Sequence, residues 1–198
     1  MKITRHKINI LRKQDPVLAD LIDSIGPIDN LELNTDHLKS AAKIIVDQQL
    51  SVKAARTIWN RLDDLVTDWS PDHVRKIDIE TLRSAGLSGQ KANYIKTLSS
   101  ALHTDSFSFN ELAKLDDVEA KNALIKIKGF GDWSAEMYLI FTLGRENVFS
   151  IKDAGLKRAV IKLYDIDEKH YLKKIDLISE KWQPYKSIAS LYLWAWLD

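Results

Sequence analysis

The stretch "IKIKGFGDWSAEMYLIF", residues 125 to 141, decides the fold. Two of only seven glycines, Gly129 and Gly131, stand there immediately before a strongly apolar segment. Glycine adopts backbone conformations with positive φ and lets neighbouring groups approach closely. We therefore predict a helix that ends near Lys126, a tight turn, and a second helix that begins at about Asp132. Together these elements form a helix–hairpin–helix.

Such a hairpin is a candidate anion site. The first N–H groups of a helix have no partner within the helix, and the helix dipole places partial positive charge beside them, which suits a phosphate. The alternative is a tight turn between two core helices. The sequence leaves open whether Phe130, between the two glycines, is exposed or packs beneath the turn.

Composition is that of a globular protein with room for one sizeable core or two small subdomains that share one. The 198 residues are 45% apolar and 29% charged, with a net charge of +1, so any attraction for a polyanion must be local. There are no cysteines, which excludes disulfides, a thiol nucleophile and a cysteine-ligated zinc or iron–sulfur centre. The five histidines show no metal-ligand spacing.

The sequence has no apolar run of the roughly 18 residues that a membrane helix needs, and its basic start lacks the apolar stretch of a secretory signal. We therefore expect a cytoplasmic protein.

Residues that typically begin or end helices recur along the chain. Apolar residues repeat at three- and four-residue steps, and alternating strand patterns of useful length are absent, so we predict an all-α fold of roughly ten helices. Capping residues predict where helices begin: Asp15 with Pro16, Thr35, Ser51, Ser70 with Pro71, Asp78 and Ser88, with Gly26 and Gly86 after helix ends. Further helices are predicted at 109–114, 117–127, 133–143, 154–163, 168–180 and 185–197.

Residues 124–160, "LIKIKGFGDWSAEMYLIFTLGRENVFSIKDAGLKRAV", resemble the helix–hairpin–helix (HhH-GPD) DNA glycosylase superfamily. Within it, the chain looks like the 3-methyladenine DNA glycosylase II (AlkA-like) branch. Three further stretches carry the resemblance: "IIVDQQLSVKAARTIW" at 44–59, "AGLSGQKANYIKTL" at 85–98 and "WQPYKSIASLYLW" at 182–194.

The resemblance implies two helical subdomains around a cleft. We expect one to span about residues 30–143, with the hairpin at 127–132, and the other to combine about 1–29 with 144–198. Larger members carry an additional N-terminal β-rich domain, which we do not expect here.

The family's spacing from Trp133 places its catalytic aspartate at Asp153, at the seam of the subdomains. Asp153 is also a natural N-cap for the helix that follows, and both roles are compatible. A carboxylate there would stabilise positive charge on the sugar as the base departs. Lys152 occupies a place where the family often has an acidic residue, and we expect it either to change the electrostatic environment of Asp153 or to contact phosphate.

Trp133 stands where bifunctional relatives have a lysine. An indole provides no amine nucleophile, so we expect hydrolysis without lyase activity. The resemblance places Trp133 and Trp194 in the base pocket, with Met137 and Tyr138 as candidates for the same wall. An electron-rich indole attracts cationic alkylated purines. Leu193 and Trp196 are predicted to be core residues.

The resemblance also implies DNA contacts. We expect Gln49 or Leu50 to fill the gap left by the extruded nucleotide; the alternative is that Leu50 is simply core. At the hairpin, the backbone N–H groups of Gly129, Gly131 and Ser134 are expected to bind the phosphate beside the lesion. Phe130 and Lys128, where the family usually has proline, are the other predicted contacts there.

No cofactor is expected to be required. A structural Na⁺ or K⁺ at the hairpin is implied by the resemblance, held through the backbone carbonyls of Ile125, Ile127 and Gly129. The carboxylates of Glu136 and Asp47 are expected to be structural or solvated.

The predicted function is monofunctional excision of alkylated purines, of the 3-methyladenine or 7-methylguanine type, from duplex DNA in base excision repair by a monomer. The alternatives are a non-catalytic helix–hairpin–helix DNA-binding protein and a glycosylase for deaminated or oxidised bases.

Overall fold

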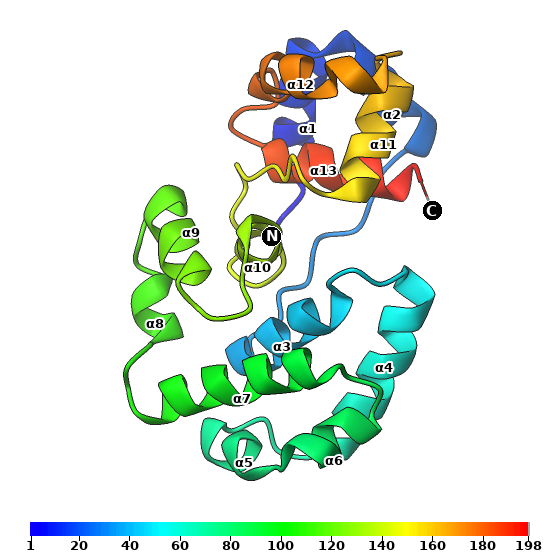
Figure 1. Ribbon diagram of the computed structural model, residues 1–198. Helices are drawn as coiled ribbons and strands as arrows, with labels where there is room; N and C mark the ends of the chain where they lie inside the picture. Colours follow the sequence, from blue (N-terminus) through cyan, green and yellow to red (C-terminus); the bar gives the residue numbers. More distant parts are fainter. Residues whose placement is uncertain (198) are drawn as a thin grey trace. The chain divides into compact units, whose positions relative to one another are not determined.

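The computed structural model describes residues 1–197, and every regular element in that range is helical (Figure 1). The all-α prediction is therefore confirmed. The chain divides into two compact units. Unit 2 is Asn34–Tyr138, and unit 1 combines Met1–Leu33 with the chain from Leu139 onward. The cleft predicted between the two subdomains stays a prediction.

Most helices begin at the capping residues that the sequence predicts. Asp15 accepts hydrogen bonds from the N–H groups of Val17 and Leu18, and α2 ends at Gly26, where φ is +79°. Side-chain caps also precede α4 (Val52–Leu65, Ser51), α5 (Pro71–Lys76, Ser70), α6 (Ile79–Ser84, Asp78) and α7 (Gly89–His103, Ser88).

Two helix starts differ from the prediction. The cap of α3 (His37–Asp47) is Asp36, which accepts from the Lys39 N–H group, and not Thr35. The helix α1 (Arg5–Gln14) was not predicted, because its sequence is mostly polar and only Leu11 is buried. Its stability therefore comes from packing against α2, a tertiary contact that local periodicity does not reveal.

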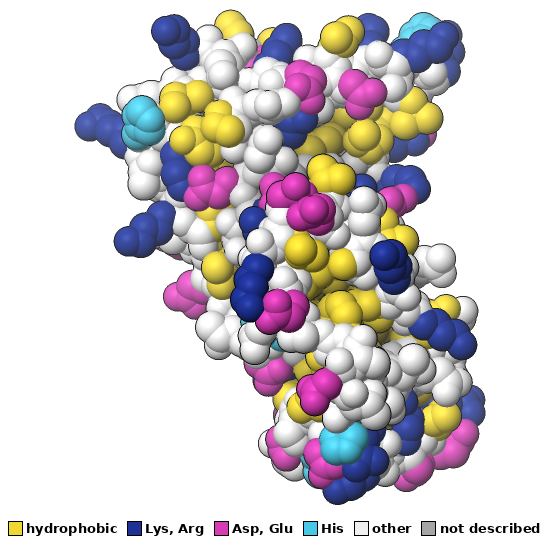
Figure 2. All heavy atoms as spheres, turned by 90° about the vertical axis from the view of Figure 1, so that its left-hand side faces the viewer, with side chains coloured by type: hydrophobic (Ala, Val, Ile, Leu, Met, Phe, Trp, Pro, Cys, Tyr) yellow, Lys and Arg dark blue, Asp and Glu magenta, His cyan; other side chains and the backbone are white. Residues whose placement is uncertain are grey.

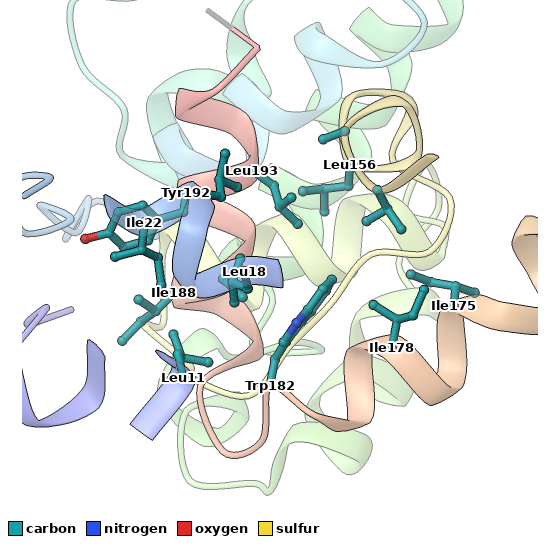
Figure 3. Packing of buried hydrophobic residues seen from close by; sticks show 14 of the residues in the cluster. Leu11, Leu18, Ile22, Leu156, Ile175, Ile178, Trp182, Ile188, Tyr192 and Leu193 are labelled. Atoms are coloured by element: carbon teal, nitrogen blue, oxygen red, sulfur yellow. The ribbon is translucent and has the colours of Figure 1, made fainter. Parts of the chain in front are cut away.

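Unit 1 surrounds one apolar core. α13 (Lys186–Ala195) contacts α2 (Pro16–Ile25) and α11 (Ala154–Leu163), and α11 also contacts α12 (Tyr171–Glu180), which follows the short 3₁₀ helix η1 (Glu168–His170). Figure 3 shows Trp182, fully buried, between Leu18 and Ile178. The core is built from residues far apart in sequence, so unit 1 needs both ends of the chain.

Asp15 joins these parts through hydrogen bonds. Its carboxylate is fully buried, and Oδ2 accepts from the Tyr164 hydroxyl at 2.6 Å and from Trp182 Nε1 at 2.9 Å. Oδ1 caps α2. Burial raises the pKa of the Tyr164 hydroxyl above its usual range, with a smaller contribution from Asp15, so the hydroxyl remains a donor. A buried carboxylate with all these donors is a structural group.

Unit 2 is organised around α7, which contacts α3, α5 and α6 (Figure 1). α8 (Phe109–Leu112) and α9 (Asp117–Ile125) follow, and α9 begins with a capping box of Asp116 and Glu119. The hairpin then leads into α10 (Asp132–Phe141). None of the helices in residues 1–197 combines the length and apolarity that crossing a membrane requires.

Candidate active site and nucleic-acid contacts

The Asp153 side chain is held in place by hydrogen bonds within unit 1. As the N-cap of α11, its Oδ1 accepts from the Leu156 N–H group at 2.8 Å. The same oxygen accepts from Trp194 Nε1 on α13 at 3.0 Å. Asp153 remains partly exposed. The structure therefore brings together the two residues that the sequence assigned to catalysis and to the base pocket.

Gly155, which the sequence analysis did not single out, makes this contact possible. A Cβ added there would lie 3.1 Å from Asp153 Oδ1 and 3.3 Å from Cδ1 of Trp194. Contacts this short would require the cap or the indole to shift. The sequence shows a glycine in "DAGLK", but the reason for it appears only in the structure. Its φ is ordinary, and the close approach of Asp153 and Trp194 leaves little room for a Cβ.

Trp194 also borders a pocket. Its ring lies 5.5 Å from that of Phe141, at the end of α10, with the two planes inclined by 36°. Both rings line a pocket of about 490 Å³, a size suited to a small organic ligand. The rest of the wall is Leu191, Ala195 and the segment 28–32, which includes the carboxylates of Asp29 and Glu32.

The glycines of the hairpin have different roles. Gly129 has φ +100°, and an added Cβ would lie 2.4 Å from the Tyr94 ring, so no other residue fits without rearrangement. At Gly131 an added Cβ would meet nothing within 4 Å. The close approach at the hairpin is therefore that of an aromatic ring on α7 to Gly129.

The hairpin retains the donors that an anion site needs. Within the described part of the chain, the N–H groups of Gly129 and Gly131 have no hydrogen-bond partner. Lys128 beside them is exposed. These groups stand at the start of α10, where the helix dipole favours negative charge.

One of the predicted DNA contacts at the hairpin, that of the Phe130 side chain, needs correction. Phe130 is only 6% exposed, its N–H group donates to the Ile127 carbonyl at 3.0 Å, and its ring packs edge-on against Tyr138. Ser134 is 2% exposed, and its hydroxyl accepts from the Gln48 side chain. Phe130 therefore supports the hairpin from beneath and does not present its side chain to DNA. The contact predicted for Ser134 is through its backbone N–H group, and it stays a prediction.

The predicted pocket wall formed by Met137 and Tyr138 is also wrong. Met137 is 5% exposed and Tyr138 is fully buried. The Tyr138 hydroxyl lies 2.6 Å from His37 Nδ1, and its ring stacks on Phe109. Burial raises the pKa of Tyr138 above its usual range. These side chains are core residues. Trp133, in the first turn of α10, is partly exposed.

The turn between α3 and α4 presents the predicted wedge residues. Gln49 has φ +56°, which is unusual for a residue with a side chain, and is exposed. Leu50 is 38% exposed, which contradicts the alternative that it is a core residue.

Gln48, which the sequence analysis did not assign, ties this turn to the hairpin. Its Nε2 donates to the Gly129 carbonyl at 2.7 Å and to Ser134 Oγ at 2.8 Å. The predicted monovalent cation would use the same Gly129 carbonyl, while the Ile127 carbonyl already accepts from Phe130. A cation would have to share the Gly129 and Ile127 carbonyl oxygens with these donors. The cation site, including the Ile125 carbonyl as a ligand, stays a prediction.

Other predicted residues lie as follows. Lys152, next to Asp153, is exposed. Glu136 is buried and paired with Lys121 at 2.6 Å, and Asp47 is paired with Lys43, so both are structural. Leu193 is fully buried in the core of unit 1, as predicted, and Trp196 is half-buried against it.

Comparison with known proteins fits the hairpin and the capped aspartate. Residues 42–184 match the model of the HhH-GPD superfamily base excision DNA repair proteins. The chain belongs to this family.

Within the HhH-GPD family, the chain is 33% identical over 160 residues to YfjP of Bacillus subtilis, covering 77% of this chain and 56% of that protein. It therefore spans little more than half the length of that relative. The crystal structure of a DNA-3-methyladenine glycosidase from Bacillus halodurans is 34% identical, with a TM-score of 0.79 over 95% of this chain and 87% of that one. The 3-methyladenine DNA glycosylase Mag1 of Schizosaccharomyces pombe, bound to abasic DNA, is 26% identical, with a TM-score of 0.85 over 96% of this chain and 95% of that one.

Proposed function

We propose that this HhH-GPD protein is a monofunctional DNA glycosylase that excises alkylated purines, such as 3-methyladenine and 7-methylguanine, from duplex DNA. The observation that carries the proposal is the Asp153 carboxylate, fixed by the Leu156 N–H group and by Trp194 Nε1 while partly exposed. Relatives named as 3-methyladenine glycosylases share the family and the fold.

The chemistry follows from the carboxylate. Breaking the bond between base and sugar develops positive charge on the sugar, which a nearby carboxylate stabilises. At about 4 Å and an effective dielectric constant of about 20, the attraction is about 4 kcal/mol. This corresponds to about a thousandfold in rate. Water then attacks the sugar carbon from which the base has departed. Asp153 either stabilises the positive charge on the sugar or orients that water.

The indole rings account for the choice of base. An alkylated purine is cationic and leaves readily, so binding matters more than protonation. A cation over an indole gains about 0.5–2 kcal/mol. We assign this role to Trp194, which borders the pocket with Phe141. Trp133 offers no amine for a Schiff base, so no strand cleavage follows.

Access to the sugar requires extrusion of the nucleotide, which costs a few kcal/mol. Gln49 and Leu50 are exposed and would fill the gap in the base stack. The N–H groups of Gly129 and Gly131, with Lys128, would bind the neighbouring phosphate. We propose that the protein acts as a monomer in the cytoplasm, associated with the nucleoid if the organism is prokaryotic, and that it requires no resident cofactor.

Substitution of Asp153 by asparagine tests the proposal. Asn is also a good N-cap and keeps an oxygen for Leu156 and Trp194, so the fold is preserved while the charge is lost. We expect single-turnover release of 7-methylguanine from methylated duplex DNA to fall by about a thousandfold. The control is Asp78→Asn, at the N-cap of α6. Equal release by wild type and Asp153→Asn, or none from either, rejects the catalytic assignment.

A further inference from the structure

A lysine of α7 holds the turn that carries Gln49 and Leu50. Lys91 Nζ donates to the Val46 carbonyl at 2.9 Å and to the Gln48 carbonyl at 2.7 Å. These carbonyls belong to the end of α3, where backbone acceptors lack helical partners and a cation is favourable. Lys91 is half-buried, and this burial lowers its pKa while the charge of Asp47 opposes the shift.

The same helix also supports the hairpin. Tyr94, one turn after Lys91, packs its ring against Gly129, where it leaves no room for a Cβ. Gln90 donates to the Tyr94 hydroxyl at 2.5 Å. From the other side, the Gln48 side chain donates to the Gly129 carbonyl and to Ser134. Gln48 thus accepts from Lys91 with its backbone and donates to the hairpin with its side chain.

We propose that Lys91 and Gln48 are positioning residues that lock the turn of Gln49 and Leu50 to the phosphate-binding hairpin, so that extrusion of the base and grip on the backbone occur together. This inference rests on the proposed glycosylase function and assigns residues to its extrusion step. Neither residue touches the reacting atoms; both act through the turn.

The strain in the turn explains why a brace is needed. Gln49 adopts φ +56°, a backbone conformation that residues with a Cβ rarely adopt. Such a conformation persists only where surrounding contacts over-determine it. Without Lys91, two carbonyls lose their donor, and the turn gains freedom to relax and withdraw Leu50. Without the Gln48 side chain, Lys91 still binds the carbonyls of the turn, but the hydrogen bonds that fix the turn relative to the hairpin are lost.

The measurement that distinguishes a positioning role from a general structural role is how the rate of base release depends on the pairing of the target base. Extrusion costs least for a base that is already unpaired. A residue that acts on extrusion should matter for 7-methylguanine opposite cytosine and matter much less for 7-methylguanine opposite an abasic-site analogue. A residue that acts on chemistry or on folding should affect both substrates alike.

The experiment measures single-turnover release from these two duplexes in the full chain. We expect Lys91→Met and Gln48→Ala each to slow release from the paired duplex by about tenfold, the effect of one or two lost hydrogen bonds, and from the unpaired one by less than about threefold. Lys91→Arg should restore most of the rate. The double variant should lose less than the product of the two single losses, because both residues serve one network.

The matched control is Lys96→Met. Lys96 lies on the same helix and donates to the Ile77 carbonyl, away from the hairpin. Lys96→Met should leave the ratio of the release rates from the two duplexes unchanged. If Lys91→Met fails to fold by circular dichroism, Gln48→Ala decides alone. Equal slowing on both duplexes, or no slowing on either, overturns the inference, whereas a wild type that releases no base overturns the proposed function instead.

Discussion

At the scale of the residue, Asp153 serves two purposes with one side chain. The hydrogen bond to the Leu156 N–H group begins α11, and the bond from Trp194 Nε1 fixes the carboxylate against α13. A group whose position is set by the fold requires little reorganisation when charge develops beside it. The cap and the proposed catalytic function therefore reinforce each other.

Trp194 has two separable contributions, its N–H donor and its aromatic face. Trp194→Phe keeps a ring but removes the bond to Asp153, so we expect release of 7-methylguanine to fall by about tenfold with duplex affinity unchanged, because a hydrogen bond to a charged group contributes about 1.5–3 kcal/mol. Trp194→Ala should lose more, and should weaken excision of cationic bases more than binding of duplex DNA.

These effects are measured by single-turnover rates and by fluorescence anisotropy of duplex binding. Trp196→Phe is the control, because the Lys162 ammonium lies 4.4 Å from the centre of the Trp196 ring. A larger loss of duplex affinity than of excision in Trp194→Ala contradicts the pocket assignment.

At the scale of the element, the start of α3 and the middle of α10 meet in an aromatic cluster with a titratable member. His37 stacks on Phe109 with ring centres 5.4 Å apart, and its Nδ1 lies 2.6 Å from the Tyr138 hydroxyl. Burial lowers the pKa of His37, with a smaller opposing effect from Asp36. The folded state therefore binds fewer protons at this site than the unfolded chain does.

This shift predicts a pH dependence of stability. The unfolded histidine takes up its proton below about pH 6.5 while the folded one resists, so the free energy of unfolding falls as the pH decreases through that range. His37→Gln lacks this proton uptake. We expect the stability difference between wild type and variant to narrow as the pH falls from about 7.5 to about 5.5. Urea denaturation at both pH values measures it, and parallel pH profiles would contradict the assignment.

The elements that the sequence predicts best are those with local causes. Asp15, Ser51 and Asp78 cap their helices through bonds to N–H groups two or three residues away, so the cause and the effect share one short segment. α1 escaped prediction because its single buried side chain depends on α2. The residues of α10 were misassigned because its middle is buried all round, which leaves no polar face to indicate direction.

The candidate site divides in the same way. Asp153 was predictable because a helix cap and a family spacing coincide there. The roles of Gln48 and Lys91 could not be predicted, because their hydrogen-bond partners lie 81 and 43 positions away in the chain and no local sequence pattern indicates them. Gly155 belongs to this group too, since its purpose appears only once Trp194 lies beside it.

At the scale of the whole molecule, the charge distribution decides how DNA is attracted. With a net charge of +1, the chain has almost no net charge that would attract DNA at long range. Figure 2 shows Lys and Arg side chains spread over the visible face among Asp and Glu, without one continuous basic patch. Because the net charge is small, we expect the attraction that the proposed function requires to come from groups at the contact itself, such as the hairpin N–H groups and the exposed Lys128.

A contact with few cations predicts a modest salt dependence that single lysines change measurably. The logarithm of DNA affinity should fall linearly with the logarithm of salt concentration, and each phosphate neutralised contributes about 0.9 to the slope. Lys128→Gln should reduce the slope by about one. Lys169→Gln should not, because the Lys169 ammonium is already paired with Asp167 at 2.8 Å. Titrations of labelled duplex at several salt concentrations give these slopes. An affinity that does not change with salt argues against phosphate binding at the hairpin. Equal slopes for wild type and Lys128→Gln would mean that groups other than Lys128 bind the phosphates.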